Sequence, residues 1–76
     1  MSALLEAKDI LSGCLFVPVD RIGDDVSLQS IKELDSLSFA AIATELEERL
    51  GRPMDPVDLI RLRTVRDLAG LIERHR

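Results

Sequence analysis

The stretch Leu34–Gly51 reads LDSLSFAAIATELEERLG, and it contains the start signal, the apolar face and the stop signal of one helix. Its apolar side chains recur at helical spacing, at Phe39, Ile42, Ala43, Leu46 and Leu50. Asp35 stands where an N-cap residue is expected, because its carboxylate can accept hydrogen bonds from the free amides of the first turn. Gly51 favours the left-handed conformation that ends a helix. The sequence therefore predicts a helix that begins after Asp35 and ends near Leu50, with this stripe buried.

Three further helices are expected around this one. The first runs from about Ala3 to Phe16 and cannot continue through Pro18. A short helix from about Pro56 to Arg61 has proline in the favoured first position. A capping box at Thr64 to Asp67 opens the last helix, whereas residues 19–34 have no sustained period and predict a long loop. We expect an all-α fold, a small four-helix bundle with three longer helices, one short helix and a long first loop.

Length and composition exclude several classes of protein. The chain has 76 residues, enough for one domain spanning residues 1–76. Cys14 is the single cysteine, so neither an internal disulfide nor a cysteine-based metal site is expected, and its place on an apolar stripe predicts a buried thiol. The N-terminal residues do not resemble a signal peptide, and no apolar run approaches the ~20 residues that a membrane span needs. We therefore expect a cytoplasmic protein with no membrane association.

Charge is distributed unevenly. Residues 1–60 carry twelve acidic and five basic side chains, whereas residues 61–76 carry two acidic and five basic ones, for a net charge of −4. The C-terminal arginines raise the alternative of a small helix-turn-helix domain that binds nucleic acid. Net acidity and the presence of only two aromatic residues, Phe16 and Phe39, weigh against that alternative. Charge asymmetry of this kind indicates recognition of a partner or, more simply, a solvated surface.

Ser36 is the clearest candidate for a residue that takes part in a chemical reaction. As the first residue of a helix it would lie beside unpaired amides at the positive end of the helix dipole, a favourable place for an attached or bound phosphate. A catalytic serine would need a general base, but the only histidine is His75, next to the C-terminus, and no Gly-x-Ser-x-Gly motif surrounds Ser36. We therefore expect an exposed acceptor that another enzyme modifies, with no catalytic residue and no metal ligand in this chain.

The tripeptide Asp35-Ser36-Leu37 at a helix start resembles the acyl carrier proteins and the related peptidyl and aminoacyl carrier domains. The segment VPVDRIGDDVSL, residues 17–28, is similar to the first loop of that family. The segment ATELEERLGR, residues 43–52, is similar to the end of its second helix, and LRTVRDLAGLIERH, residues 62–75, to its last helix and the approach to it. The resemblance spans nearly the whole chain and implies a carrier protein domain at residues 1–76.

The resemblance also implies a function. A phosphopantetheinyl transferase, which supplies Mg²⁺, would move 4′-phosphopantetheine from coenzyme A onto the Ser36 hydroxyl. The thiol of that arm would carry an acyl or aminoacyl group as a thioester, loaded by a ligase and delivered to an acyltransferase or synthase. The protein would be a monomer and not an enzyme.

Partner recognition in the family implies roles for residues around the motif and along the second helix. The candidates are Asp35, Leu37, Ala40, Ala41, Thr44, Glu47 and Glu48. Carriers of fatty acid synthesis typically show acids along this face, whereas the first turns here are uncharged, which favours a specialised pathway such as secondary metabolism or dedicated acyl or aminoacyl transfer. Alanines that simply favour helix formation, a housekeeping fatty-acid carrier, and a helical protein-interaction adaptor without a prosthetic group are the alternatives.

Overall fold

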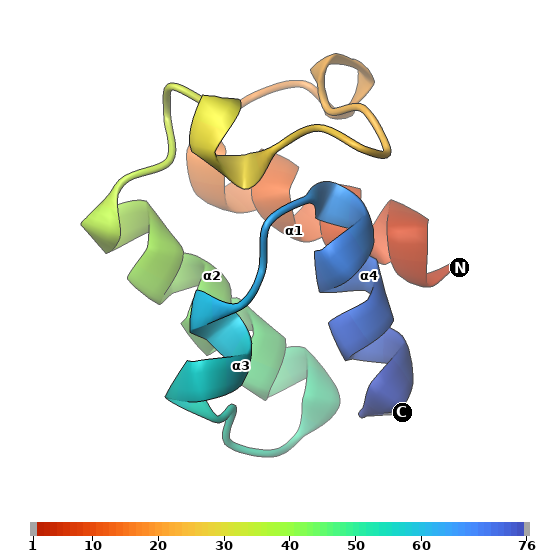
Figure 1. Cartoon of the computed structure of the whole chain (residues 1–76), viewed down its shortest axis with the longest axis vertical. Coiled ribbons are helices and arrows are strands. Elements are labelled where there is room, and N and C mark those ends of the chain that lie inside the picture. Colours follow the sequence, from red (N-terminus) through yellow and green to blue (C-terminus); the bar gives the residue numbers. More distant parts are fainter. Residues whose placement is uncertain (1, 76) are drawn as a thin grey trace.

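The computed structural model describes residues 2–75, and its regular structure is helical (Figure 1). The four α-helices are α1 (Ala3–Leu15), α2 (Ser36–Leu50), α3 (Pro56–Ile60) and α4 (Val65–Arg74). Two 3₁₀ turns that the sequence did not predict, η1 (Val19–Arg21) and η2 (Leu28–Ser30), lie in the connection between α1 and α2. The predicted all-α fold, the order of its helices and the long first loop are confirmed.

Local capping groups start each α-helix at the predicted place. The Ser2 hydroxyl accepts a hydrogen bond from the Leu5 amide at the start of α1. Asp55 accepts from the Val57 amide at the start of α3, with Pro56 as its first residue. At α4 the capping box is complete, because the Thr64 hydroxyl accepts from the amide of Asp67 and the Asp67 carboxylate accepts from the amide of Thr64. These starts depend on side chains within three residues, which explains why the sequence predicts them.

The end of α1 differs from the prediction by one residue. The helix stops at Leu15, and Phe16 takes the left-handed conformation with φ 58° and ψ 40°. The hydroxyl of Ser12 donates to the carbonyl oxygen of Val17 at 2.6 Å, which fixes the chain as it leaves the helix. A left-handed cap was not predicted here because that conformation normally requires glycine.

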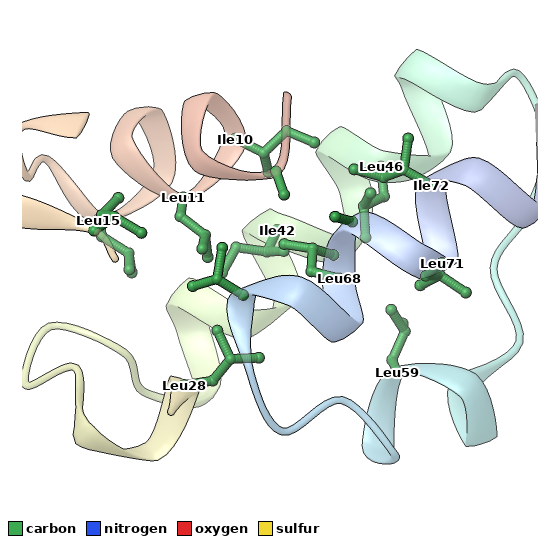
Figure 2. Packing of buried hydrophobic residues seen from close by; sticks show 14 of the residues in the cluster. Ile10, Leu11, Leu15, Leu28, Ile42, Leu46, Leu59, Leu68, Leu71 and Ile72 are labelled. Atoms are coloured by element: carbon green, nitrogen blue, oxygen red, sulfur yellow. The ribbon is translucent and has the colours of Figure 1, made fainter. Parts of the chain in front are cut away.

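The hydrophobic core receives side chains from all four α-helices and from the first loop (Figure 2). Its most deeply buried large residues are Ile10, Leu11, Leu46, Val65, Leu68, Leu71 and Ile72. The closest packing partner of α1 is α4, followed by α2. Leu28 from η2 and Leu59 from α3 complete the core (Figure 2). No helix in the described part of the chain is long and apolar enough to cross a bilayer.

Burial of two predicted apolar stripes is incomplete. On α2 only Ile42 and Leu46 are buried, whereas Phe39, Ala43 and Leu50 are half-buried. Phe39 lines an open hollow together with residues of η2 and α3, which leaves its side chain partly exposed. Cys14 on α1 is also half-buried rather than fully buried, and its partial burial still raises the pKa of the thiol.

The first loop is tied to the connection before α4 by backbone pairing. The Leu28 amide donates to the carbonyl of Arg63 at 2.7 Å, and the Val65 amide donates to the carbonyl of Val26 at 3.1 Å. Ser27 and Thr64 form the isolated antiparallel bridge between these bonds. Ile22 and Leu28 are buried and anchor the loop to the core, whereas Val19 is exposed.

Ion pairs reinforce the same arrangement. Arg66 on α4 pairs with Asp25 at 2.7 Å, and Lys8 on α1 pairs with Asp24. Arg49 on α2 pairs with Glu45, as the i,i+4 spacing predicts, and also with Asp9 on α1. Part of the uneven charge seen in the sequence is therefore used inside the domain, in pairs that join the loop to α1 and α4 and that join α1 to α2.

Candidate functional site

The start of α2 is closed by Asp35. Its backbone is extended, with φ −136° and ψ −173°, and its Oδ1 accepts a hydrogen bond from the Ser38 amide at 2.8 Å. The Asp35 carbonyl oxygen accepts from the Phe39 amide, also at 2.8 Å, which is the first bond of the helix. Ser36 is therefore the first helical residue, as predicted.

Hydrogen bonding also sets the charge of the cap. The backbone amide of Ser38, and to a smaller extent its hydroxyl, hold the pKa of the Asp35 carboxyl below its ordinary value. The Ser38 hydroxyl donates to the carbonyl oxygen of Glu33 at 3.2 Å, which links the first turn of α2 to the segment before it. Asp35 is ionised at neutral pH, and its charge is directed toward the amide that it caps.

Ser36 itself is exposed, as predicted, so an external enzyme can reach its hydroxyl. The amides of the first turn and the positive end of the dipole of this 15-residue helix favour an anion at this position. A phosphodiester esterified to Ser36 fits these surroundings. The neighbouring Asp35 carboxylate opposes it only in part, because its charge is already compensated by the Ser38 amide.

An apolar hollow of about 450 Å³ opens beside Ser36. Its lining comes from η2, from the start of α2 and the two residues before it, from α3 and from the second residue after α3, namely Leu28, Gln29, Leu34, Asp35, Ser36, Phe39, Leu59, Ile60 and Leu62. Apart from Gln29 and the two residues of the motif, the lining is apolar. A group attached to the serine would thus have a largely apolar surface directly next to it, with the Asp35 carboxylate as the one charged group of the lining.

The uncharged strip predicted on α2 is present and exposed. The strip consists of Leu37, which is 84% exposed, and of Ala40, Ala41 and Thr44. The Thr44 hydroxyl donates a hydrogen bond to the Ala40 carbonyl oxygen at 3.0 Å. The two acids farther along the helix differ from each other. Glu48 is exposed, whereas Glu47 is half-buried and accepts a hydrogen bond from the Met54 amide at 2.9 Å. Glu47 therefore fixes the connection between α2 and α3.

Two exposed apolar residues of α3 were not among the predicted site residues. Ile60 is 78% exposed and lines the hollow beside Ser36, and Val57 is also exposed. Leu59, by contrast, points into the core. Val57 and Ile60 are spaced i,i+3, so they lie on one face of the short helix, away from the buried Leu59. This spacing is the sequence signal from which a second apolar surface could have been predicted.

Groups that could support catalysis are not gathered at Ser36. Residues 2–75 contain no cluster of three or more His, Cys, Asp or Glu side chains that could hold a metal ion. His75 follows the last turn of α4, about 15 Å along that helix from its start, by the rise per residue. The only ionisable side chain in the lining of the hollow is the carboxylate of Asp35.

A comparison with known protein families agrees with this geometry. The model of the family described as the phosphopantetheine attachment site matches residues 6–72, from the first turns of α1 into the last turns of α4. Domains of this family are the attachment site of the 4′-phosphopantetheine prosthetic group and are in general non-catalytic carriers. They interact with phosphopantetheinyl transferases and with synthases or ligases. The chain belongs to the acyl carrier protein family and is a phosphopantetheine-bearing carrier.

Proposed function

We propose that Ser36 is the residue that bears 4′-phosphopantetheine, and that residues 1–76 act as one monomeric carrier unit. The observation that carries this proposal is the exposed hydroxyl on the first residue of a capped helix. It combines access for a modifying enzyme with a favourable environment for the phosphate that remains. The thiol of the bound group supplies the point at which an acyl or aminoacyl cargo is held as a thioester.

The transfer needs only one reacting atom from this chain. The Ser36 oxygen forms a bond to the phosphorus of coenzyme A that carries the pantetheine, and that phosphorus releases the adenosine bisphosphate part. The hydroxyl proton passes to a base of the transferase, because the one carboxylate in the lining beside Ser36, that of Asp35, already accepts from the Ser38 amide. Asp35 holds the first turn, and so the position of Ser36, while the helix amides stabilise the negative charge.

The surface around Ser36 supports docking by close packing. Leu37 and Ile60 are large, apolar and exposed, and Ala40 and Ala41 present small side chains that let a partner backbone approach. Asp35 and Leu37 would contact the transferase, whereas the rest of the strip, with Thr44, Glu47 and Glu48 farther along α2, would meet the loading ligase and the acyltransferase or synthase. Because the first turns of the strip carry no charge, this surface favours a dedicated carrier in a specialised pathway.

Intact-mass analysis of the apo-protein, incubated with coenzyme A and a broad-specificity phosphopantetheinyl transferase, tests the attachment. We expect the wild-type chain to gain one phosphopantetheinyl group and Ser36→Ala to gain none. Ser30→Ala is the matched control, because Ser30 is also an exposed serine near the start of α2 in sequence, and it should be modified like the wild type. Modification of Ser36→Ala would contradict the assignment. An unmodified wild type, under conditions that modify a known carrier, would instead favour an adaptor without a prosthetic group.

A further inference from the structure

We infer that Phe16 is an anchor for the phosphopantetheinyl transferase, a contact separate from the strip on α2. This inference rests on the proposed attachment at Ser36. The occupant of the surface around Phe16 would be a protein with an apolar pocket for the ring and a carboxylate beside that pocket.

The first observation is that folding does not account for this side chain. Phe16 is 92% exposed, and among the described residues it is the only one other than glycine with a positive φ, at 58°. A bulky residue is unfavourable in the left-handed region, where glycine is tolerated without strain. Because the ring is exposed to solvent, the protein does not gain the free energy that burying an aromatic side chain would provide. A phenylalanine at this position therefore costs stability without contributing to the core.

The second observation is that the ring is held out on a fixed backbone. The next residue, Val17, is buried, and its carbonyl oxygen accepts the 2.6 Å hydrogen bond from the Ser12 hydroxyl. Pro18 follows with φ −63°, a value that its ring imposes. An exposed aromatic side chain on a rigid segment loses little backbone freedom on binding, which favours its use as an anchor.

The position of Phe16 identifies the partner. Figure 1 shows that α1 ends and α2 begins at the end of the bundle where the first loop lies. Val17, the residue after Phe16, lines a hollow of about 340 Å³ together with Lys32 and Glu33. The Glu33 carbonyl oxygen accepts a hydrogen bond from the Ser38 hydroxyl, which connects this hollow to the first turn of α2. The transferase must bring its active site to the Ser36 oxygen itself. Enzymes that act on the cargo meet the far end of the arm and can lie farther away.

Charge near Phe16 indicates the chemistry of the partner. Arg21 and Lys32 line this hollow together with the acidic Glu33, and all three are exposed. Neither Arg21 nor Lys32 forms an ion pair with another residue of the range 2–75. Two unpaired cations against one carboxylate give this lining a net positive charge in a chain whose net charge is −4, which fits a carboxylate on the transferase.

A second copy of this chain does not fit the same surface. The exposed apolar residues here are Phe16, Pro18 and Val19. The largest of these three side chains can bury about 200 Å² of surface. Together the three bury much less than the ~800 Å² of surface per partner that a stable protein interface needs. The anchor suits a transient enzyme contact that the α2 surface extends.

The test is the steady-state kinetics of modification of the apo-protein by the phosphopantetheinyl transferase of its own host, with coenzyme A saturating. Phe16→Gly and Phe16→Asn both remove the ring and accept a left-handed backbone, so both should fold. We expect the KM for the carrier to rise about thirtyfold in each, the lower end of the effect of a binding hot spot, with kcat within about twofold of wild type. Phe16→Tyr keeps the ring and should keep the wild-type KM.

Leu5→Ala is the matched control. Leu5 is an exposed apolar residue on the same helix, about 15 Å from its C-terminal end by the rise per residue, and its loss should leave the KM unchanged. The double variant Arg21→Glu with Lys32→Glu should raise the KM and weaken its salt dependence. An unchanged KM in both Phe16→Gly and Phe16→Asn would overturn the anchor while leaving the carrier function intact. A wild-type chain that is not modified at all would contradict the proposed function instead.

Discussion

The Oδ1 oxygen of Asp35 lies 2.8 Å from the backbone nitrogen of Ser38, so a single carboxylate closes the first turn of α2 around Ser36 and Leu37. Ser36 and Leu37, the two residues between Asp35 and Ser38, are both exposed to solvent. The Ser36 hydroxyl is therefore positioned by a helix cap that lies within four consecutive residues. A small domain can in this way present a defined serine hydroxyl without a cleft.

Replacing the cap should loosen that turn. Asp35→Ala removes the acceptor of the Ser38 amide and should lower the free energy of unfolding, measured by urea denaturation at pH 7. Asp35→Asn is the matched control, because its side-chain oxygen can still cap the helix and it should retain most of the stability. An Asp35→Ala chain as stable as the wild type would show that the cap does not hold the turn.

Acid should destabilise the domain through its hydrogen-bonded carboxylates. The pKa values of Asp25, Asp35 and Asp67 are lowered below 3.8, chiefly by Arg66 for Asp25, by the Ser38 amide for Asp35 and by the Thr64 amide for Asp67. For a lowered pKa, the stabilisation is complete above the unfolded value and is lost as the pH falls through the folded value. Urea denaturation between pH 7 and pH 2 should therefore show stability decreasing below about pH 4. A stability that is constant or rising in that range would contradict these assignments.

Core and surface leucines on α2 should respond differently to truncation. Leu46 is fully buried, so Leu46→Ala should cost about 2–5 kcal/mol of unfolding free energy, measured by urea denaturation. Leu37→Ala is the control on the same helix and should change stability by less than about 0.5 kcal/mol, because Leu37 is exposed. Equal losses would mean that α2 does not face the core through Leu46.

The sequence predicts those parts of the fold that depend on neighbouring residues. The starts of the four helices follow from caps at Ser2, Asp35, Asp55 and Thr64, each of which bonds an amide two or three residues away. The position of Ser36 at the head of α2 follows from the same local chemistry. That is why the sequence alone predicts Ser36 as the first residue of α2.

Features that depend on distant residues could not be predicted in this way. The bridge between Ser27 and Thr64 joins segments far apart in the chain through backbone atoms, which carry no sequence signal. Half-burial of Phe39 depends on the hollow that η2, α2 and α3 leave open beside it. The left-handed Phe16 runs against the local preference for glycine, so a rule based on neighbouring residues misses it.

The cap of α4 should have a measurable share in stability. Thr64→Ala removes the oxygen that accepts from the Asp67 amide and should cost about 1 kcal/mol of unfolding free energy. Thr64→Ser retains the hydroxyl and should retain the cap. If both variants lost the same stability, the loss would come from packing of the threonine methyl group rather than from the cap.

Fragmentation mass spectrometry of the modified wild-type chain locates the attached group on one residue and so decides whether Ser36 bears it. We expect phosphopantetheine on Ser36 alone. Its location on Ser30, Ser38 or any other side chain would disprove the attachment at Ser36, even if the intact mass showed a single addition.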